Sequence, residues 1–461
     1  MQRTALRGFL AGSGVAALAL LFVPDAVVPE VEAHTILPPT AVTANQGLLT
    51  VRTALDRSAL SSKGPQVRYA VVELTADDQV DGDVPVHVSL VMDTSGSMSG
   101  QKLADAKLAA EALVGQLEPG DSVSLVGFAT RASTFQAPTT IHHLGSTLDG
   151  LAYLDAGGDT NMSEGLWSGI SNLNAVTAHG SKRLVLLGDG HATAGSTGTS
   201  SLASIATGAQ KQGITVSALG LGLDFDVETM AAVADAGGGR YHYVESPSAL
   251  AGMLADELRE ADQLAAQSVT VEISPAAGVT VLDVFGYESW DGRATSTGWE
   301  ALVGDMSGGA TRKVVAKLQV DPELAGDALG QVSVSFADPA TGVSESVQHR
   351  LWSVTSDDPE VLERAVDDRA VALVGQVHEG RAREQAAALR REGRVEGADA
   401  VLDTFSRELA SLSSQYKAPG LRKNSEKLEA QRLTWRGVEA GSRAEMSLAA
   451  EEQLRALGYV E

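Results

Sequence analysis

The stretch VPVHVSLVMDTSGSMSG, residues 84–100, decides how this chain folds. Its first half is a run of apolar and β-branched residues, which is typical of a strand buried on both faces of a sheet. The run ends abruptly in Asp93, and two serines follow at alternate positions, Ser95 and Ser97. Binding sites in open parallel sheets form beyond the carboxyl ends of the strands. We therefore expect a site at this turn.

The sequence around this stretch, residues 84–264, alternates short apolar strands with amphipathic helices. This alternation predicts an α/β domain with a doubly wound, mostly parallel sheet covered by helices on both faces. Strands are expected at 86–92, 122–129, 183–188, 214–220 and 240–244, with an edge strand near 132–135. Helices are expected at 100–117, 162–174, 200–212, 226–236 and 247–264.

The segments that flank this domain have other patterns. Residues 265–355 show period-two strands separated by Gly, Pro and Asp, which predicts a β-sandwich. Residues 34–83 begin as an extended linker and continue with strands that are candidates to complete the sandwich, in which case the α/β domain is inserted into it. Residues 356–461 are rich in Ala, Arg, Glu and Leu and predict a C-terminal helical region for packing or oligomerisation.

The N-terminus predicts export. Arg3 and Arg7 precede the apolar segment GFLAGSGVAALALLFVP, and residues 1–33 have the features of a signal peptide. We expect the periplasm, the cell envelope or the extracellular space as the location. An uncleaved N-terminal membrane anchor is the alternative.

Composition excludes several functions. The net charge of −24 repels nucleic acid, so we expect no DNA or RNA partner. The chain has no cysteine, which excludes disulfides, thiol catalysis and cysteine-ligated zinc.

Three loops of the α/β domain carry oxygen ligands. Asp93, Ser95 and Ser97 lie in one turn, Thr160 lies in AGGDTNMSEGL at 156–166, and Asp189 ends the strand in RLVLLGDGHAT at 183–193. Carboxylate and hydroxyl oxygens suit Mg²⁺, which takes about six oxygens at about 2.1 Å. Five groups from three loops can thus converge on one cation.

The stretch DTSGSMSG resembles the Asp-x-Ser-x-Ser signature of von Willebrand factor A (VWA) domains, whose site is the metal-ion-dependent adhesion site (MIDAS). The resemblance covers residues 84–262 and includes GGDTNMSEGL, LLGDG and VSALGLGLDFDVETMAAVADAGGGRYHYVESPSALAGML. It implies a metal site formed by the following residues: Asp93, Ser95, Ser97, Thr160 and Asp189. The serines would bind the ion directly, the aspartates directly or through water, and the threonine would enter and leave the coordination sphere.

Two positions depart from the family pattern. Asp159 stands between the glycine pair and Thr160, which would add a carboxylate and favour Ca²⁺ or Mn²⁺. Gly188 stands where Thr or Ser usually precedes the last aspartate, which removes a supporting hydroxyl.

These patterns predict an exported bacterial VWA-domain protein that binds a divalent cation, Mg²⁺ or else Mn²⁺ or Ca²⁺. Through the cation it would bind an Asp or Glu of a protein partner, as an adhesion or assembly module. The alternative is a scaffold subunit of an envelope complex in which the metal only orders the fold. We expect no enzymatic activity, because no Walker motif, nucleophile elbow or metalloprotease helix appears.

The sequence also predicts the places of several tryptophans and of one histidine. The tryptophans of the predicted domains are expected in cores: Trp167, Trp290, Trp299 and Trp352. His191 lies two residues after Asp189 and is a candidate contact for a partner.

Overall fold

Of the 461-residue chain, the computed structural model describes residues 40–78, 80, 84–142, 148–188, 191–221, 226–244, 247–286, 292–294, 298–325 and 327–436. The expected signal peptide, residues 1–33, lies outside the described residues, as does Asp189. Export and the complete ligand set therefore stay predictions.

The α/β domain contains one six-stranded sheet, in the order β10-β9-β8-β5-β6-β7. Every neighbouring pair is parallel except β6 and β7, so β7 is the antiparallel edge strand. The strands are β5 Val86–Asp93, β6 Ser122–Phe128, β7 Ala132–Thr140, β8 Ser181–Gly188, β9 Ile214–Leu221 and β10 Gly238–Val244. All eight residues of β5 are buried, as expected for a central strand covered on both faces.

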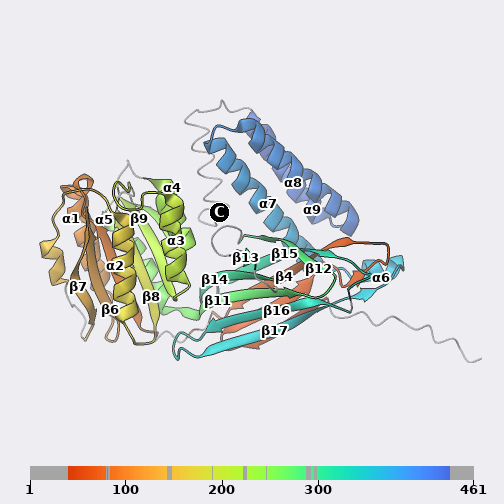
Figure 1. Ribbon diagram of the computed structural model, residues 1–461, viewed down its shortest axis with the longest axis horizontal. Helices are drawn as coiled ribbons and strands as arrows, with labels where there is room; N and C mark the ends of the chain where they lie inside the picture. The colour runs from red at the N-terminus through yellow and green to blue at the C-terminus, as the bar shows by residue number, and fades with distance from the viewer. Residues whose placement is uncertain are drawn as a thin grey trace, which may run out of the picture. The chain divides into compact units, whose positions relative to one another are not determined.

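Helices cover both faces of this sheet (Figure 1). One face packs against α1 and α5, and the other packs against α2, α3 and α4. The helices are α1 Gln101–Val114, α2 Met162–Ala175, α3 Thr199–Gln210, α4 Val227–Ala236 and α5 Pro247–Asp262. The predicted doubly wound α/β fold is confirmed.

Strand order places the carboxyl end of β5 at a topological switch point. The chain leaves β5 for β6 on one side, whereas β8 pairs with β5 on the other side. The connections therefore diverge beyond Asp93, which is where open α/β sheets form their ligand crevice.

Two five-stranded sheets form a β-sandwich with its own core. One sheet has the order β1-β2-β4-β15-β12: β1 Ala41–Gln46, β2 Leu49–Leu55, β4 Gln66–Ala76, β15 Thr311–Val320 and β12 Val279–Phe285. The other has the order β13-β14-β11-β16-β17: β13 Gly292–Ala294, β14 Trp299–Ser307, β11 Leu264–Pro275, β16 Ala328–Ala337 and β17 Ser344–Trp352. Two short strands, β3 Ala59–Leu60 and β18 Val354–Thr355, pair separately. Since β4 pairs with β15, strands that precede the α/β domain and strands that follow it share one sheet.

The C-terminal region is helical and packs on the sheet that contains β4, through a core that includes Tyr69, Phe285 and Val315. Its helices are α6 Pro359–Arg364, α7 Asp368–Arg391, α8 Val395–Tyr416 and α9 Pro419–Arg436. Asp358 caps α6 by accepting a hydrogen bond from the Glu360 N–H at 2.8 Å. Among the described residues, no helix has the length and apolarity to cross a membrane.

Three expectations about individual residues and segments were wrong or incomplete. Trp167 is 55% exposed, because α2 turns Leu166 and Ile170 to the sheet and leaves the tryptophan on the outer side. Trp352 is 39% exposed, on the outward side of the alternating strand β17. Trp299 does pack against the sandwich core, and Trp290 lies outside the described residues. The segment expected as a linker also contributes a strand, β1.

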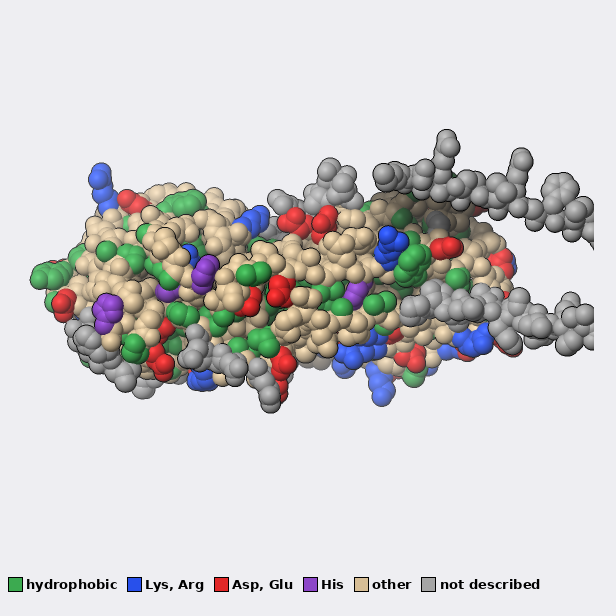
Figure 2. Space-filling model, turned by 90° about the horizontal axis from the view of Figure 1, so that it is seen from below, with side chains coloured by type: hydrophobic (Ala, Val, Ile, Leu, Met, Phe, Trp, Pro, Cys, Tyr) green, Lys and Arg blue, Asp and Glu red, His purple; other side chains and the backbone are tan. Residues whose placement is uncertain are grey.

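The charged surface agrees with the composition. On the face in Figure 2, acidic and basic side chains are interspersed with apolar ones among the described residues. An interspersed surface of this kind favours solubility over binding to a polyanion.

Candidate metal centre

The turn after β5 is held in place by its own polar groups and by the core. Asp93 is fully buried, and its Oδ1 accepts a hydrogen bond from the Ser95 N–H at 2.7 Å. The hydroxyl oxygens of Ser95 and Ser97 lie 3.0 Å apart. Met98, in the short 3-10 helix Gly96–Met98, is buried in the core below. One carboxylate and two hydroxyls are therefore grouped at the end of the central strand.

The loop before α2 is hydrogen-bonded directly to this turn. The Gly157 N–H donates to the Thr94 carbonyl at 2.8 Å, and the Gly96 N–H donates to the Gly158 carbonyl at 3.1 Å. Thr160 follows in the same loop and is only 4% exposed. Two of the three predicted ligand loops thus lie side by side.

The loop turns tightly against Thr130 at Gly158 and Asp159, where Asp159 is the residue that departs from the family pattern. Gly158 has a φ of +84°, and a Cβ there would lie 2.7 Å from the Thr130 hydroxyl oxygen. The Asp159 N–H donates to the same Thr130 hydroxyl at 3.1 Å, and Asp159 itself is exposed. The glycine therefore allows the loop to turn tightly against Thr130 before it reaches Thr160.

The third predicted ligand, Asp189, lies outside the described residues, but the residue before it does not. A Cβ at Gly188 would lie 2.7 Å from the Asp93 Cβ and 3.1 Å from its Oδ2. The end of β8 therefore passes directly beside Asp93. The glycine at position 188 therefore does more than omit a supporting hydroxyl. Any larger side chain at this position would collide with the buried side chain of Asp93.

The donor set fits a small divalent cation. A buried carboxylate needs compensation for its lost hydration, and the two serine hydroxyls supply further oxygen atoms. Ser95 is buried whereas Ser97 is exposed, so the turn opens to solvent on its serine side. Among the described residues, no three His, Asp or Glu side chains gather where they could hold a metal. A centre at this place would therefore depend on hydroxyl ligands.

Two supporting residues were not found from the sequence. Thr94 is buried and its hydroxyl donates to the Phe128 carbonyl at 3.0 Å, which ties the turn to β6. Thr193 accepts a hydrogen bond from the Thr160 N–H at 2.9 Å through its hydroxyl. Nothing in the sequence marks either threonine, because both act through backbone groups of distant residues. His191 is exposed, which leaves its expected role in partner contact as a prediction.

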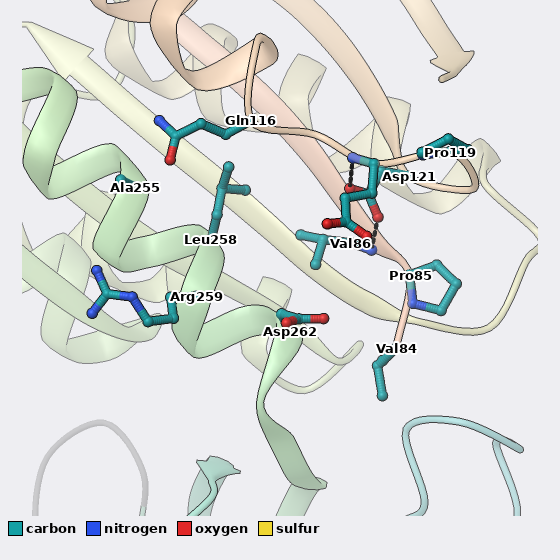
Figure 3. A pocket seen from close by; sticks show the side chains of 11 residues that line it. Val84, Pro85, Val86, Gln116, Pro119, Asp121, Ala255, Leu258, Arg259 and Asp262 are labelled. Carbon is teal, nitrogen blue, oxygen red and sulfur yellow. Dashed lines mark hydrogen bonds between the residues drawn. The ribbon is translucent and has the colours of Figure 1, made fainter. Parts of the chain in front are cut away.

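A cavity of about 260 Å³ lies at the opposite edge of the sheet, where β5 begins (Figure 3). Its most prominent carboxylate, Asp121, accepts hydrogen bonds from the Val86 N–H at 2.8 Å and the Glu118 N–H at 2.7 Å. Asp121 thus anchors a turn. This cavity has no grouping of hydroxyls like that at Ser95 and Ser97.

A cavity of about 470 Å³ between the α/β domain and β14 contains four arginines: Arg183, Arg240, Arg259 and Arg312. Arg183 lies near the buried Glu257, and Arg259 pairs with Asp256 on the surface of α5. Burial raises the pKa of Glu257, but hydrogen bonds from His242 and Ser217 and the charge of Arg183 lower it overall. Arg183 therefore compensates a buried acid, which argues for a structural role.

Comparisons with known proteins agree with this geometry. Residues 87–256 match the family model of the von Willebrand factor type A domain. The uncharacterized protein sll0103 of Synechocystis is 28% identical over 62% of this chain and 69% of its own length. The inter-alpha-trypsin inhibitor heavy chain H1 of Mesocricetus auratus is 34% identical over 30% of this chain, which spans only 16% of that protein.

A solved structure shows the same fold over most of the molecule. The von Willebrand factor type A protein from Catenulispora acidiphila superposes with a TM-score of 0.64, covering 91% of this chain and 99% of its own. At 17% identity this likeness shows the fold alone. The central sheet, the turn after β5 and the matched residues lead to one conclusion: residues 87–256 form a von Willebrand factor type A domain.

Proposed function

We propose that this chain is an exported VWA-domain protein that binds a divalent cation and, through it, an acidic group of a protein partner. The residues that would hold the ion are Asp93, Ser95, Ser97, Thr160 and Asp189. Mg²⁺ suits this set best, with Mn²⁺ and Ca²⁺ as alternatives. The observation that supports the proposal most strongly is the hydrogen-bonded pairing of the Asp93 turn with the Thr160 loop at the switch point of the sheet.

The charges of the ligands explain how a partner would be recognised. A bound divalent cation supplies positive charge and a coordination position for a carboxylate. Asp93 and Asp189 would together neutralise the ion, whereas the hydroxyls of Ser95, Ser97 and Thr160 would add oxygen atoms without charge. The exposure of Ser97 gives an acidic side chain of a partner a route to the site.

Isothermal titration calorimetry tests the metal site. We expect residues 34–461 to bind MgCl₂, MnCl₂ and CaCl₂, and Asp93→Ala to abolish the binding, because the turn loses its only carboxylate. Asp256→Ala is the matched control, since Asp256 is a half-exposed aspartate of the same domain that pairs with Arg259 on the surface of α5. Equal binding by wild type and Asp93→Ala contradicts the assignment.

A pulldown with and without EDTA separates the binding module from the scaffold alternative. Bait protein would be incubated with envelope extract in MgCl₂ at about ten times the measured Kd, so that the site is nearly full. A partner of a binding module is released by EDTA and is not captured by Asp93→Ala. If the captured proteins are the same under all conditions while EDTA lowers only the melting temperature, the metal orders the fold and the scaffold function is supported.

Export is tested by the N-terminus of the protein produced in its natural host. Mass spectrometry of the intact chain is expected to show a start at His34, after cleavage of residues 1–33. A chain that keeps these residues and sediments with membranes supports the uncleaved anchor.

We also propose that the protein is not an enzyme. Turnover of generic ester or phosphate substrates by the wild type, abolished in Asp93→Ala, contradicts this proposal.

A further inference from the structure

The segment after Asp189 lies against the loop that carries Thr160. The Thr160 carbonyl accepts hydrogen bonds from the Thr193 N–H at 2.9 Å and the Ala194 N–H at 3.1 Å. In return, the Thr160 N–H donates to the Thr193 hydroxyl at 2.9 Å. The backbone of Thr160 is therefore held from both sides by one residue of the neighbouring loop.

The next residues of the segment continue this contact. The Ser196 N–H donates to the Ser163 hydroxyl at 3.1 Å, and that hydroxyl donates to the Asn161 side-chain oxygen at 2.8 Å. Gly195 has a φ of +68°, and a Cβ there would lie 2.1 Å from the same Asn161 oxygen. Residues 193–196 thus fit closely over the start of α2, and only a glycine fits at position 195.

These bonds fix the place of Thr160 without using its hydroxyl. Both backbone groups of Thr160 are engaged by Thr193 and Ala194, so the side-chain hydroxyl is its remaining polar group. The Thr160 loop is also bonded to the Asp93 turn through Gly157 and Gly158. The Thr193 hydroxyl thus holds the backbone of the residue that carries the Thr160 hydroxyl.

We propose that Thr193 is a positioning residue of the metal site, which sets the affinity for the cation and the preference for Mg²⁺ by holding the backbone of Thr160. The inference rests on the proposed metal binding. Mg²⁺ requires nearly ideal octahedral geometry, whereas Ca²⁺ accepts six to eight ligands in flexible arrangements. A loosened Thr160 therefore weakens Mg²⁺ binding more than Ca²⁺ binding.

The experiment is calorimetric titration of MgCl₂ and of CaCl₂ into residues 34–461 and single variants. Thr193→Val removes the hydroxyl at nearly constant volume and is expected to raise the Kd for Mg²⁺ at least about tenfold, as loss of a residue that orients a metal ligand usually does. The Kd for Ca²⁺ is expected to rise less. Thr193→Ser keeps the hydroxyl and restores wild-type binding. Thr207→Val is the matched control, since its hydroxyl bonds only within α3.

A double-mutant cycle shows whether Thr193 acts through Thr160. In a Thr160→Val background, Thr193→Val is expected to have no further effect on the Kd, because the ligand that it positions is gone. If the two effects add independently, the inference is overturned. Circular dichroism and the melting temperature without metal show whether each variant is folded.

Gly195→Ala is a second way to displace the segment, and it leaves Thr193 unchanged. Its added methyl group collides with Asn161, so we expect weaker Mg²⁺ binding here too. Wild-type Kd values for both Thr193→Val and Gly195→Ala overturn the inference while the proposed function stands. If wild type itself binds no cation, the proposed function fails, and the inference fails with it.

Discussion

Two aspartates of this protein, Asp93 and Asp56, are both fully buried at the end of a strand, yet their surroundings differ. Asp93 ends β5 of the VWA domain and accepts a hydrogen bond from the Ser95 N–H, and the paired hydroxyls of Ser95 and Ser97 follow two and four positions further along the chain. Asp56 follows β2 of the sandwich and accepts hydrogen bonds from the Tyr69 N–H at 2.9 Å and from the Tyr416 hydroxyl at the end of α8.

The difference separates a carboxylate that holds parts of the fold together from one that is proposed to bind a cation. Asp56 is compensated by the protein itself, through Tyr416 from 360 residues away and the nearby charge of Arg68. It thereby joins the sandwich to the C-terminal helices. Asp93 is followed by the paired hydroxyls of Ser95 and Ser97, and Gly188 packs directly against it. The same buried group therefore serves assembly in one region and is proposed to bind a cation in the other.

The largest expected effect concerns stability at Asp56. Asp56→Ala leaves the Tyr69 N–H and the Tyr416 hydroxyl buried without their acceptor, so we expect the free energy of unfolding to fall by about 3–5 kcal/mol in total. Urea unfolding followed by circular dichroism measures this. The Kd for Mg²⁺ is expected to stay within about twofold of wild type. A large loss of metal binding in a folded Asp56→Ala variant contradicts the division of roles.

Metal is expected to stabilise the protein only where Asp93 is present. At a Mg²⁺ concentration of about one hundred times its Kd, the free energy of unfolding should rise by about 2.7 kcal/mol, because the ion binds the folded state alone. Urea unfolding with MgCl₂ and with EDTA measures the difference. Asp93→Ala should show none, and an equal gain in that variant means that the cation binds elsewhere.

Packing beside Asp93 is tested by a pair of glycine substitutions. Gly188→Ala places a methyl group 2.7 Å from the Asp93 Cβ and is expected to lower the free energy of unfolding by about 1–3 kcal/mol and to weaken Mg²⁺ binding. Gly208→Ala in α3 meets nothing within 4 Å and should stabilise the helix by up to about 1 kcal/mol. The same two measurements, urea unfolding and calorimetry, apply to both variants. Equal effects show that Gly188 is not packed as described.

The smallest expected effect is a pH dependence at the junction of α8 with β15. The His378 imidazole and the Lys317 ammonium lower the pKa of Glu408 from 4.5 to about 2. A lowered pKa means that ionised Glu408 stabilises the fold above about pH 4.5, and that this contribution disappears as the pH falls toward 2. Glu408→Gln is therefore expected to lower stability by less than about 1 kcal/mol at neutral pH. Urea unfolding at several pH values should show this difference shrinking in acid, and a constant difference argues against the ion pair.

Residues close together in the sequence gave the accurate predictions. The alternation of strands and helices predicted the α/β sheet, because periodicity over ten to fifteen residues reports which faces are buried. The turn at Asp93, Ser95 and Ser97 was also visible, since its groups lie within five residues. The burial of Trp167 was predicted wrongly, because apolar character alone does not say which side of a helix faces the sheet.

Tertiary structure alone decided how these parts combine. The pairing of β4 with β15 brings together strands separated by the whole VWA domain, and the contact of Asp56 with Tyr416 joins opposite ends of the chain. Gly188 lies against Asp93 and Thr193 is hydrogen-bonded to Thr160, and both contacts form only when the chain folds. The sequence by itself determined the strands, the helices and the chemistry of the Asp93 turn, because short-range periodicity and turn residues encode them. Partners across the fold depend on how the whole chain packs, and no short stretch contains that information.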